Sequence, residues 1–428
     1  MSLLAEHGAI VLGQKSMTMR RNASEGWSGH HCIGDMDTDL QAHESKNPRV
    51  TLTRACSFSN VCWAPATGEW LYYQNDSPQH GEGLPSLATS SGGARRRDML
   101  SLKVVNRREP SGAHVARIRR LTALMGGRFA PNIGHFVWDH AFALLTSMSQ
   151  LGVYASELNV LRTSACMKHG SQNGFVPELC AALADAFLAP LNGRSPVASP
   201  RGWVRTLDEL RAAHPTSKRL CFDQLQAGGT YNAFDAEPLN VGREGFIALY
   251  RYRVLQWHGL NPLASAASPR ILLVRKTGKH ADSGRHKRFI SNFEEVSEYV
   301  RGRFGQHADI RVTSFADMTF ADQLKQVTST SISFSPCGGI SMILPFLPHG
   351  AHVVLTNYII RTADPHWVGF HGECAVSCVH RTRTQTRHIS APIICCASNV
   401  AARRTARGRW RSSCGATCAT STRSTIAF

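Results

Sequence analysis

Long hydrophobic runs are missing from this 428-residue sequence. No apolar stretch approaches the roughly 18–20 residues that a membrane-spanning helix needs. The first residues, MSLLAEHGAIVLGQKSMTMRR, include an apolar patch, but no basic residues precede it, as they would in a signal peptide. The sequence therefore predicts neither a membrane span nor a signal peptide. If the natural protein follows the secretory route, we expect its anchor to be missing from this chain.

Acidic residues are missing from the end of the chain. Residues 379–428 contain nine arginines and no Asp, Glu or Lys, so they account for half of the net charge of +18. Thr, Ser, Ala and Cys fill this segment without a hydrophobic period, and such a composition cannot build a core. We expect residues 376–428 to be a basic low-complexity tail that is disordered or that arises from a shifted reading frame. The alternative is a basic arm that binds nucleic acid or an acidic surface.

A second cysteine pair at metal-binding spacing is also missing. Among thirteen cysteines, Cys56 and Cys62 in CSFSNVC are the most suggestive pair. They flank a turn, and they can bridge each other or other cysteines. Disulfides would indicate an oxidising lumen, whereas a structural zinc site would need a second pair.

Hydrophobic periodicity divides the chain into four parts. Residues 1–48 have no clear period and predict a poorly ordered lead. Residues 49–243 begin with a predicted β-hairpin around a PATGEW turn and continue as an α/β domain. A long helix at 244–260 opens a second α/β domain that ends at residue 375, in which strands alternate with helices of about 10–15 residues, typical of parallel βαβ units. In the first domain, one predicted helix carries a wide stripe of residues expected to face the core: Phe136, Val137, His140, Ala141, Leu144, Leu145 and Met148.

A polar element lies at the start of that helix. In PNIGHFVWDH, residues 131–140, apolar and aromatic residues separate Asn132, His135 and Asp139. His135 and Asp139 are four residues apart and project from one face of a helix, which indicates a catalytic face. The alternatives are a histidine that serves the core and an acid favoured by the helix dipole. A metal site that includes His140 is a further alternative, but His140 is rotated about a third of a turn away and no further ligand is evident.

Ligands of open parallel sheets bind where strands end and helices begin. In the second domain, a basic loop with one acid, Asp282, follows the predicted strand RILLVRK. Its cations are Arg275, Lys276, Lys279, Arg285, Lys287 and Arg288. Because guanidinium groups hold phosphate oxygens in pairs, this loop suits a diphosphate. The alternative is a solvated charged loop. The loop contains no aromatic residue, which a module that stacks nucleic-acid bases would need.

A glycine turn follows a later strand of the same domain. In SPCGGIS, Gly338 and Gly339 let the backbone come close to a ligand, and the N–H groups of the next helix point at an anion. The turn lacks the spacing of the dinucleotide fingerprint and of the P-loop. By itself it is a weak signal, but together with the basic loop it predicts a nucleotide-diphosphate pocket.

The order of these motifs resembles glycosyltransferase family 61, which includes plant xylosyl- and arabinosyltransferases and extracellular O-linked N-acetylglucosamine transferases. The resemblance covers about residues 50–360. It rests on CSFSNVC and GEWLYY, NIGHFVWD, LLVRK with HKRFISNFEEV, and SFSPCGGISMILPFLPHGAHVVL. The Asn…His…Asp element of the family matches Asn132, His135 and Asp139.

Two further family elements match in part. An Arg…Arg-Ile-x-Asn element matches Arg275, Arg288, Ile290 and Asn292, with Phe289 and Ser291 in between. A His-Gly-Ala-Gly-Leu element corresponds to Pro336-Cys337-Gly338-Gly339-Ile340-Ser341. The glycine turn is kept, but the histidine is replaced by Cys337.

The resemblance implies an inverting glycosyltransferase of the GT-B layout, with two Rossmann-like α/β domains that face a cleft. Residues 49–243 would be the acceptor-side domain and residues 244–375 the nucleotide-sugar-binding domain. It also implies a nucleotide-sugar donor, expected to be a UDP-sugar, no obligatory metal, a glycoprotein or polysaccharide acceptor, and the Golgi or ER lumen. No nucleic acid is expected as a partner, and a membrane only through an anchor that this chain lacks. Two alternatives stay open: a catalytically degenerate sugar- or nucleotide-binding relative, and a basic nucleic-acid-binding protein.

Inversion requires a base that takes the proton of the acceptor hydroxyl, and cations that stabilise the departing diphosphate. We expect Asp139 or His135 to be the base, with His135 better suited by a usual pKa near 6.5. Asn132 is expected to orient the pair or the acceptor. The residues expected to bind the donor are Arg275, Lys276, Lys287, Arg288, Asn292, Gly338, Gly339 and Ser341.

Overall fold

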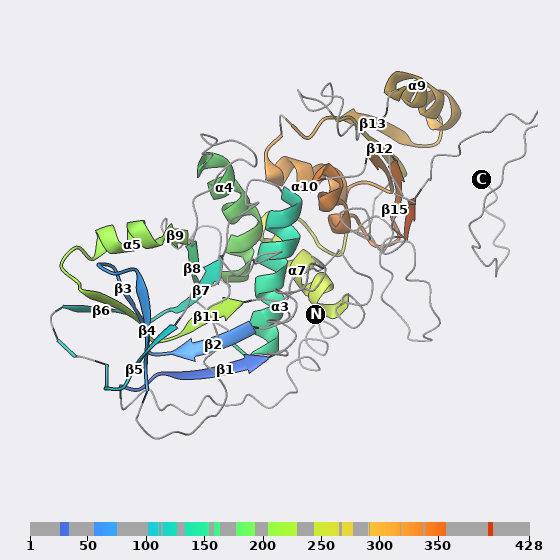
Figure 1. The fold of residues 1–428 in the computed structure, drawn as a ribbon. Helices are drawn as coiled ribbons and strands as arrows, with labels where there is room; N and C mark the ends of the chain where they lie inside the picture. The colour runs from blue at the N-terminus through green and yellow to red at the C-terminus, as the bar shows by residue number, and fades with distance from the viewer. Residues whose placement is uncertain are drawn as a thin grey trace, which may run out of the picture.

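The computed structural model describes residues 26–33, 55–74, 102–109, 111–112, 114–125, 133–153, 158–162, 177–192, 204–228, 244–264, 268–276, 290, 292–316, 318–336, 339–356 and 393–396. These residues form a mixed α/β structure with three sheets (Figure 1). Two sheets belong to the N-terminal half and one to the C-terminal half. Helices α3 (Ala143–Gln150), α4 (Pro177–Leu183) and α7 (Glu244–Trp257) lie between them.

The N-terminal half contains a six-stranded sheet in the order β1-β2-β11-β7-β8-β9 and a five-stranded sheet in the order β5-β4-β3-β10-β6. The strands are β1 (Gly29–Ile33), β2 (Ala55–Ser59), β3 (Val61–Ala64), β4 (Glu69–Tyr73), β5 (Leu102–Val105), β6 (Val115–Ile118), β7 (Leu121–Met125), β8 (Leu158–Arg162), β9 (Val204–Thr206), β10 (Arg219–Phe222) and β11 (Leu225–Gly228). Strands β11, β7, β8 and β9 are parallel. The predicted hairpin is confirmed as β3 and β4, which pair antiparallel. Gly68 in its turn has a φ of 71°, which favours glycine.

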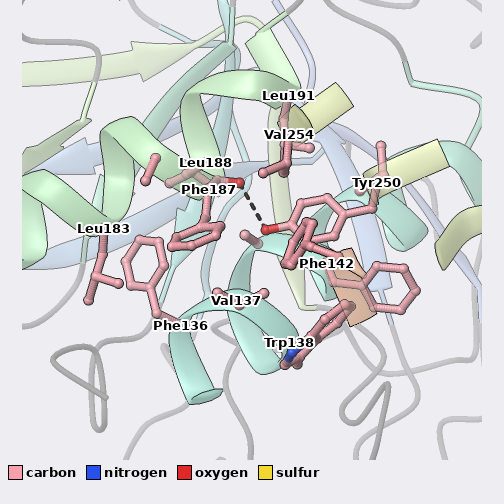
Figure 2. Packing of buried hydrophobic residues seen from close by; sticks show 14 of the residues in the cluster. Phe136, Val137, Trp138, Phe142, Leu183, Phe187, Leu188, Leu191, Tyr250 and Val254 are labelled. Atoms are coloured by element: carbon pink, nitrogen blue, oxygen red, sulfur yellow. Dashed lines mark hydrogen bonds between the residues drawn. The ribbon is translucent and has the colours of Figure 1, made fainter. Parts of the chain in front are cut away.

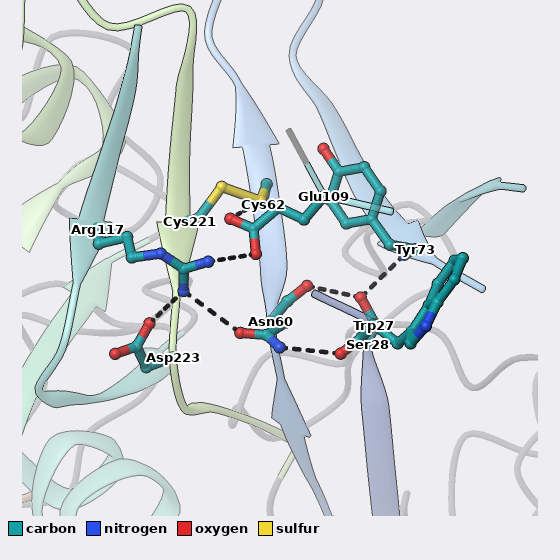
Figure 3. Close-up of polar contacts among 9 residues, drawn as sticks. All are labelled: Trp27, Ser28, Asn60, Cys62, Tyr73, Glu109, Arg117, Cys221 and Asp223. Atoms are coloured by element: carbon teal, nitrogen blue, oxygen red, sulfur yellow. Dashed lines mark hydrogen bonds and ion pairs between the residues drawn. A yellow bond between two sulfur atoms is a disulfide. The ribbon is translucent and has the colours of Figure 1, made fainter. Parts of the chain in front are cut away.

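Three segments pass directly from one sheet to the other, because β2 continues as β3, β6 as β7 and β10 as β11. Asn60 makes the first passage with a φ of 54°, a left-handed conformation that asparagine tolerates. Figure 3 shows Arg117 beside these passages, where its guanidinium donates to Asn60 Oδ1 at 3.4 Å and to Asp223 Oδ1 at 2.8 Å. It also pairs with the buried carboxylate of Glu109 at 2.5 Å. Burial raises the pKa of Glu109, and the charge of Arg117 opposes that change.

Each sheet of the N-terminal half has a disulfide that links two neighbouring strands. Cys32 and Cys56 join facing positions of β1 and β2, and Cys62 and Cys221 join facing positions of β3 and β10. Cys180 is also disulfide-bonded. Cys56 and Cys62 therefore each bridge another cysteine, which settles the alternative that the sequence left open.

Two strands form in segments for which the sequence predicts no regular secondary structure. β1 lies within residues 1–48, and β16 (Ile393–Cys396) lies within the tail. β16 pairs parallel with β15 (His352–Thr356). Each strand is held by its neighbour rather than by a period of its own, so a local pattern does not reveal it. The rest of the tail lies outside the described residues, and its predicted disorder stays a prediction.

The helix that carries the polar element is described from residue 133 onward. Its first part, η3 (His135–Phe142), is a π-helix that continues as α3. The predicted buried stripe is confirmed, since all seven of its residues are buried: Phe136, Val137, His140, Ala141, Leu144, Leu145 and Met148. Helix α4 continues into a π-helix, η4 (Ala184–Leu188), and a 3-10 helix, η5 (Ala189–Asn192).

The C-terminal half contains a parallel sheet in the order β13-β12-β14-β15-β16. Its further elements are β12 (Arg270–Val274), α9 (Phe293–Phe304), β13 (Asp309–Thr313), α10 (Phe320–Thr328), β14 (Ile332–Pro336) and η7 (Gly339–Phe346). The predicted parallel βαβ units are confirmed. The helix expected after the glycine turn is a 3-10 helix that includes Pro345, which lacks the N–H that an α-helical ladder needs. Asn292 lies at the N-cap of α9, but its Nδ2 donates to Glu295 Oε2 at 3.2 Å instead of its side chain capping the helix.

One hydrophobic core joins the two halves. Figure 2 shows Trp138, Phe142 and Phe187 of the N-terminal half packed around Tyr250 of α7. The ring centroids of Tyr250 and Phe346, which belongs to η7, are 6.2 Å apart. The hydroxyl of Tyr250 donates to the carbonyl oxygen of Phe187 at 3.0 Å.

The buried guanidinium of Arg251 extends this link. It donates to the carbonyl oxygens of Pro262 at 2.7 Å, Phe346 at 3.4 Å and Leu347 at 3.0 Å. Because α7 bonds to elements of both halves, it connects them. A domain boundary at residue 244 stays a prediction. Among the described residues, no helix has the length and apolarity to cross a membrane.

Candidate functional site

A cavity of about 590 Å³ lies between the two halves. Its walls come from Ile133 before η3, from α4 and η4, from the end of α7, and from Ala316, Met318, Thr319 and the first turn of α10 after β13. The chain reaches η3, α4 and α10 after leaving the parallel strands β7, β8 and β13. In the C-terminal half, Ala316 closely follows the end of β13, so this wall lies where a parallel strand ends and a helix begins, the usual position of ligands in α/β sheets. Its volume is typical of small-molecule sites.

The end of α7 places a histidine in the cavity wall. The Nε2 atom of His258 lies 3.0 Å from the carbonyl oxygen of Ala186. Since that oxygen only accepts, Nε2 carries a proton and donates. Burial lowers the pKa of His258, and the hydrogen bond to Ala186 acts in the opposite direction. Next to Ala186, partial burial raises the pKa of Asp185, which also lines the cavity.

Hydrogen bonds with α10 hold the segment between β13 and this helix in place. Gln323 Nε2 donates to the carbonyl oxygens of Phe315 at 3.0 Å and Met318 at 3.1 Å. Thr319 caps α10, because its Oγ1 accepts from the backbone N–H of Asp322 at 3.2 Å. These bonds fix the wall of the cavity that the C-terminal sheet supplies.

The predicted catalytic element begins at this cavity. Ile133 is part of the wall, and it lies between the predicted residues Asn132 and His135. Asn132 lies outside the described residues, as do the side chains of His135 and Asp139. The backbone of His135–Phe142 is π-helical, a rare form that is frequent at functional sites.

The predicted catalytic helix and the glycine turn are brought together. Trp138 Nε1 donates to the carbonyl oxygen of Met342 in η7 at 2.9 Å, across 204 residues of sequence. Gly339 is the first residue of η7, and Ser341 is buried in it. Gly338 lies outside the described residues.

The described part of the predicted diphosphate site follows β12, and η7 follows β14. Because these strands are parallel, both segments lie at the same edge of the C-terminal sheet. Arg275 follows β12, and its backbone N–H donates to the carbonyl oxygen of Thr313 at the end of β13, at 2.7 Å. Its guanidinium pairs with Glu294 and lies 4.9 Å from the ring centroid of Phe293. Lys276 is half-buried beside it. Lys287 and Arg288 lie outside the described residues, and Asn292 is exposed at the start of α9.

Among the described residues, none of those predicted to bind the donor lines the cavity. The sequence did not predict that His258, Asp185 and Trp257 line the cavity. The only local signal was a histidine before Gly259 at the end of a predicted helix. Arg251 gave no signal either, because two of its three hydrogen-bond acceptors are backbone oxygens 95 and 96 residues away.

A comparison with protein families identifies the chain. The model described as Glycosyltransferase 61 matches residues 133–354, more than half of the sequence. The chain belongs to glycosyltransferase family 61. This match begins just before the helix that carries His135 and ends in β15, so it includes the cavity and strands β12, β13 and β14 of the C-terminal sheet. The resemblance noted in the sequence is confirmed.

Other comparisons add little to the family 61 assignment. No curated protein matches the chain. Weakly similar solved structures include two of the dodecameric iron-containing TibC. The glycosyltransferase TibC from enterotoxigenic E. coli H10407 shares 14% identity at a TM-score of 0.25, over 56% of this chain and 59% of that chain. The heptosyltransferase TibC in complex with ADP-D-beta-D-heptose shares 10% identity at a TM-score of 0.27, over 73% and 78%. The chain thus spans about three-fifths of the first TibC structure, and at these TM-scores neither structure supports an argument about this protein.

Proposed function

We propose that this protein transfers a sugar from a nucleotide-sugar donor, a UDP-sugar, to a hydroxyl of a glycoprotein or polysaccharide with inversion at the anomeric carbon. Family membership supports glycosyl transfer. The observation that supports the rest is the cavity whose walls come from helical segments of both halves. It favours the GT-B layout, in which donor and acceptor meet between two α/β domains.

The donor diphosphate binds, in this proposal, at the end of β12. A guanidinium has five N–H donors, so Arg275 can keep Glu294 on one edge and still bind phosphate oxygens with others. Lys276, Lys287, Arg288 and Asn292 belong to the same loop and add charge or hydrogen bonds. The start of η7, with Gly338, Gly339 and Ser341, offers backbone N–H groups to the nucleotide.

The base belongs to the helix that faces this edge. Asp139 or His135 takes the proton of the acceptor hydroxyl, and Asn132 orients the pair or the acceptor. The hydrogen bond from Trp138 to Met342 supports this assignment, because it holds that helix against η7.

We also place the protein in the lumen of the Golgi or ER. The disulfides Cys32–Cys56 and Cys62–Cys221 support an oxidising compartment.

A donor-binding experiment tests the proposal. Thermal shift is measured with UDP, GDP, ADP, UDP-N-acetylglucosamine, UDP-xylose and UDP-arabinose, on wild type and on Arg275→Ala. We expect uridine nucleotides to raise the Tm of the wild type and to do so far less in the variant. Arg303→Ala, an exposed arginine later in α9, is the matched control and should behave as wild type. If no nucleotide shifts the wild type, the transferase proposal loses its support.

A further inference from the structure

The cavity and the basic loop have opposite electrostatic character. Among the described residues that line the cavity there is no lysine or arginine, and Asp185 is the acid. A diphosphate would be repelled there, whereas the described cations Arg275 and Lys276 directly follow β12. The cavity therefore suits an uncharged ligand part.

The walls of the cavity are largely apolar but end in hydrogen-bonding groups. Trp257, Met318 and Phe320 supply apolar surface, and Asp185 and His258 supply polar atoms. A sugar ring has the matching character, because its C–H faces are apolar and its hydroxyls at the rim donate hydrogen bonds. An aromatic side chain covers the face of such a ring, and a few convergent polar groups fix its orientation.

The hydrogen bond to Ala186 occupies Nε2 of His258 and leaves Nδ1 as the ring nitrogen that can accept from a ligand. Because Nε2 donates to that carbonyl oxygen, the neutral ring keeps an unprotonated Nδ1. Among the residues that the structure describes, no group donates to Nδ1. A neutral histidine held in one tautomer by a backbone carbonyl presents a fixed acceptor, the arrangement that proteins use to aim an imidazole.

We infer that this cavity is a sugar subsite, in which Nδ1 of His258 accepts a hydrogen bond from a sugar hydroxyl, Asp185 accepts a second, and Trp257 covers the ring. The inference rests on the proposed function and deepens it. It divides the donor between two places, with the diphosphate at Arg275 and the sugar beside α7. His258 is a positioning residue here, distinct from the base on η3.

Two variants of His258 test whether its donor and acceptor atoms are needed for sugar binding. His258→Gln keeps an N–H for Ala186 and an acceptor oxygen for the sugar, whereas His258→Phe keeps the ring volume but loses both. We expect His258→Phe to weaken UDP-sugar binding roughly fivefold to tenfold and to leave UDP binding unchanged. His258→Gln should restore most of the UDP-sugar affinity. Equal losses for UDP and UDP-sugar, or no loss for either, would overturn the subsite.

The pH dependence separates this role from simple packing. In the wild type, protonation of Nδ1 converts an acceptor into a donor. Because burial lowers the pKa of His258, UDP-sugar affinity should fall as the pH is lowered below the usual histidine pKa of about 6.5. UDP affinity should not follow. Asp185 is the other titratable group of the described cavity wall, and Asp185→Asn should keep the histidine step. A flat profile in His258→Gln is expected, and a step that persists there contradicts the inference.

Ring signals of His258 supply a readout that does not depend on the variants. Histidine ring carbons of ¹³C-labelled wild type are followed while UDP, UDP-N-acetylglucosamine, UDP-xylose, UDP-arabinose and the corresponding methyl glycosides are added. A sugar-containing probe should move the His258 signal, and UDP alone should not. If UDP binds but no sugar moves the signal, the subsite is wrong and the transferase proposal stands. If nothing binds at all, both are wrong.

Discussion

Trp138→Phe tests the contact that joins the predicted catalytic helix to η7. The indole is buried, and its Nε1 donates to the carbonyl oxygen of Met342 at 2.9 Å. Phenylalanine keeps the aromatic packing but leaves that carbonyl without this donor, which costs roughly 1–3 kcal/mol. The smaller ring buries less apolar area, roughly a further 1 kcal/mol. We therefore expect a loss of about 2–4 kcal/mol in the free energy of unfolding.

Thermal unfolding measures this loss. For a cooperative unit of 150–250 residues, each kcal/mol lowers the Tm by about 2–4 °C, so a fall of roughly 5–15 °C is expected. UDP binding should weaken as well, because η7 follows the glycine turn of the proposed donor site. Phe142→Leu is the matched control, since Phe142 packs in the same cluster, 5.5 Å from Trp138 between ring centroids. It should lower the Tm through packing and leave UDP binding unchanged. If Trp138→Phe melts and binds UDP like the wild type, the coupling between this helix and η7 is refuted.

Further predictions concern the base, the disulfide and the pH dependence. Asp139→Asn and His135→Ala should keep the wild-type Tm and lose sugar transfer in an assay with the donor that binds, and full activity in both variants would show that the base lies elsewhere. Cys62→Ser together with Cys221→Ser should lower the free energy of unfolding by roughly 2–5 kcal/mol in urea titrations, because a long loop is released, and an unchanged urea midpoint would contradict this. The lowered pKa of His258 means that the unfolded chain takes up a proton before the folded protein does as the pH falls. The stabilising contribution of His258 is therefore complete above its unfolded pKa near 6.5 and is lost as the pH falls through its folded pKa. Wild type should lose more Tm than His258→Gln between pH 7.5 and 5.5, and parallel losses would exclude His258 as the cause.

Local patterns were enough for much of the fold. The buried stripe from Phe136 to Met148 repeats at helical spacing, so the sequence shows it without any partner. The βαβ units of the second half were equally visible, because short apolar runs alternate with capped amphipathic segments. Family membership also followed from motif order, since such motifs keep their residues in sequence even when the contacts between them are distant.

Pairings across long distances were not visible in this way. Cys62 bonds to Cys221 over 159 residues, and the local sequence around Cys62 fits several partners equally well. β1 and β16 lack a strong period, and each becomes a strand because a neighbouring edge offers hydrogen bonds. The local sequence of such a segment does not indicate which strand it will pair with.

The site divides along the same line. The polar element and the basic loop each place reactive residue types a few positions apart. The sequence alone therefore predicted His135, Asp139 and Arg275 as site residues. The cavity was not foreseeable, because its walls come from helices and strand ends that meet only when the two halves share a core. The tautomer of His258 depends on a carbonyl oxygen 72 residues away. Short-range periodicity encodes which elements form, whereas the free energy of packing them together chooses which distant atoms become neighbours.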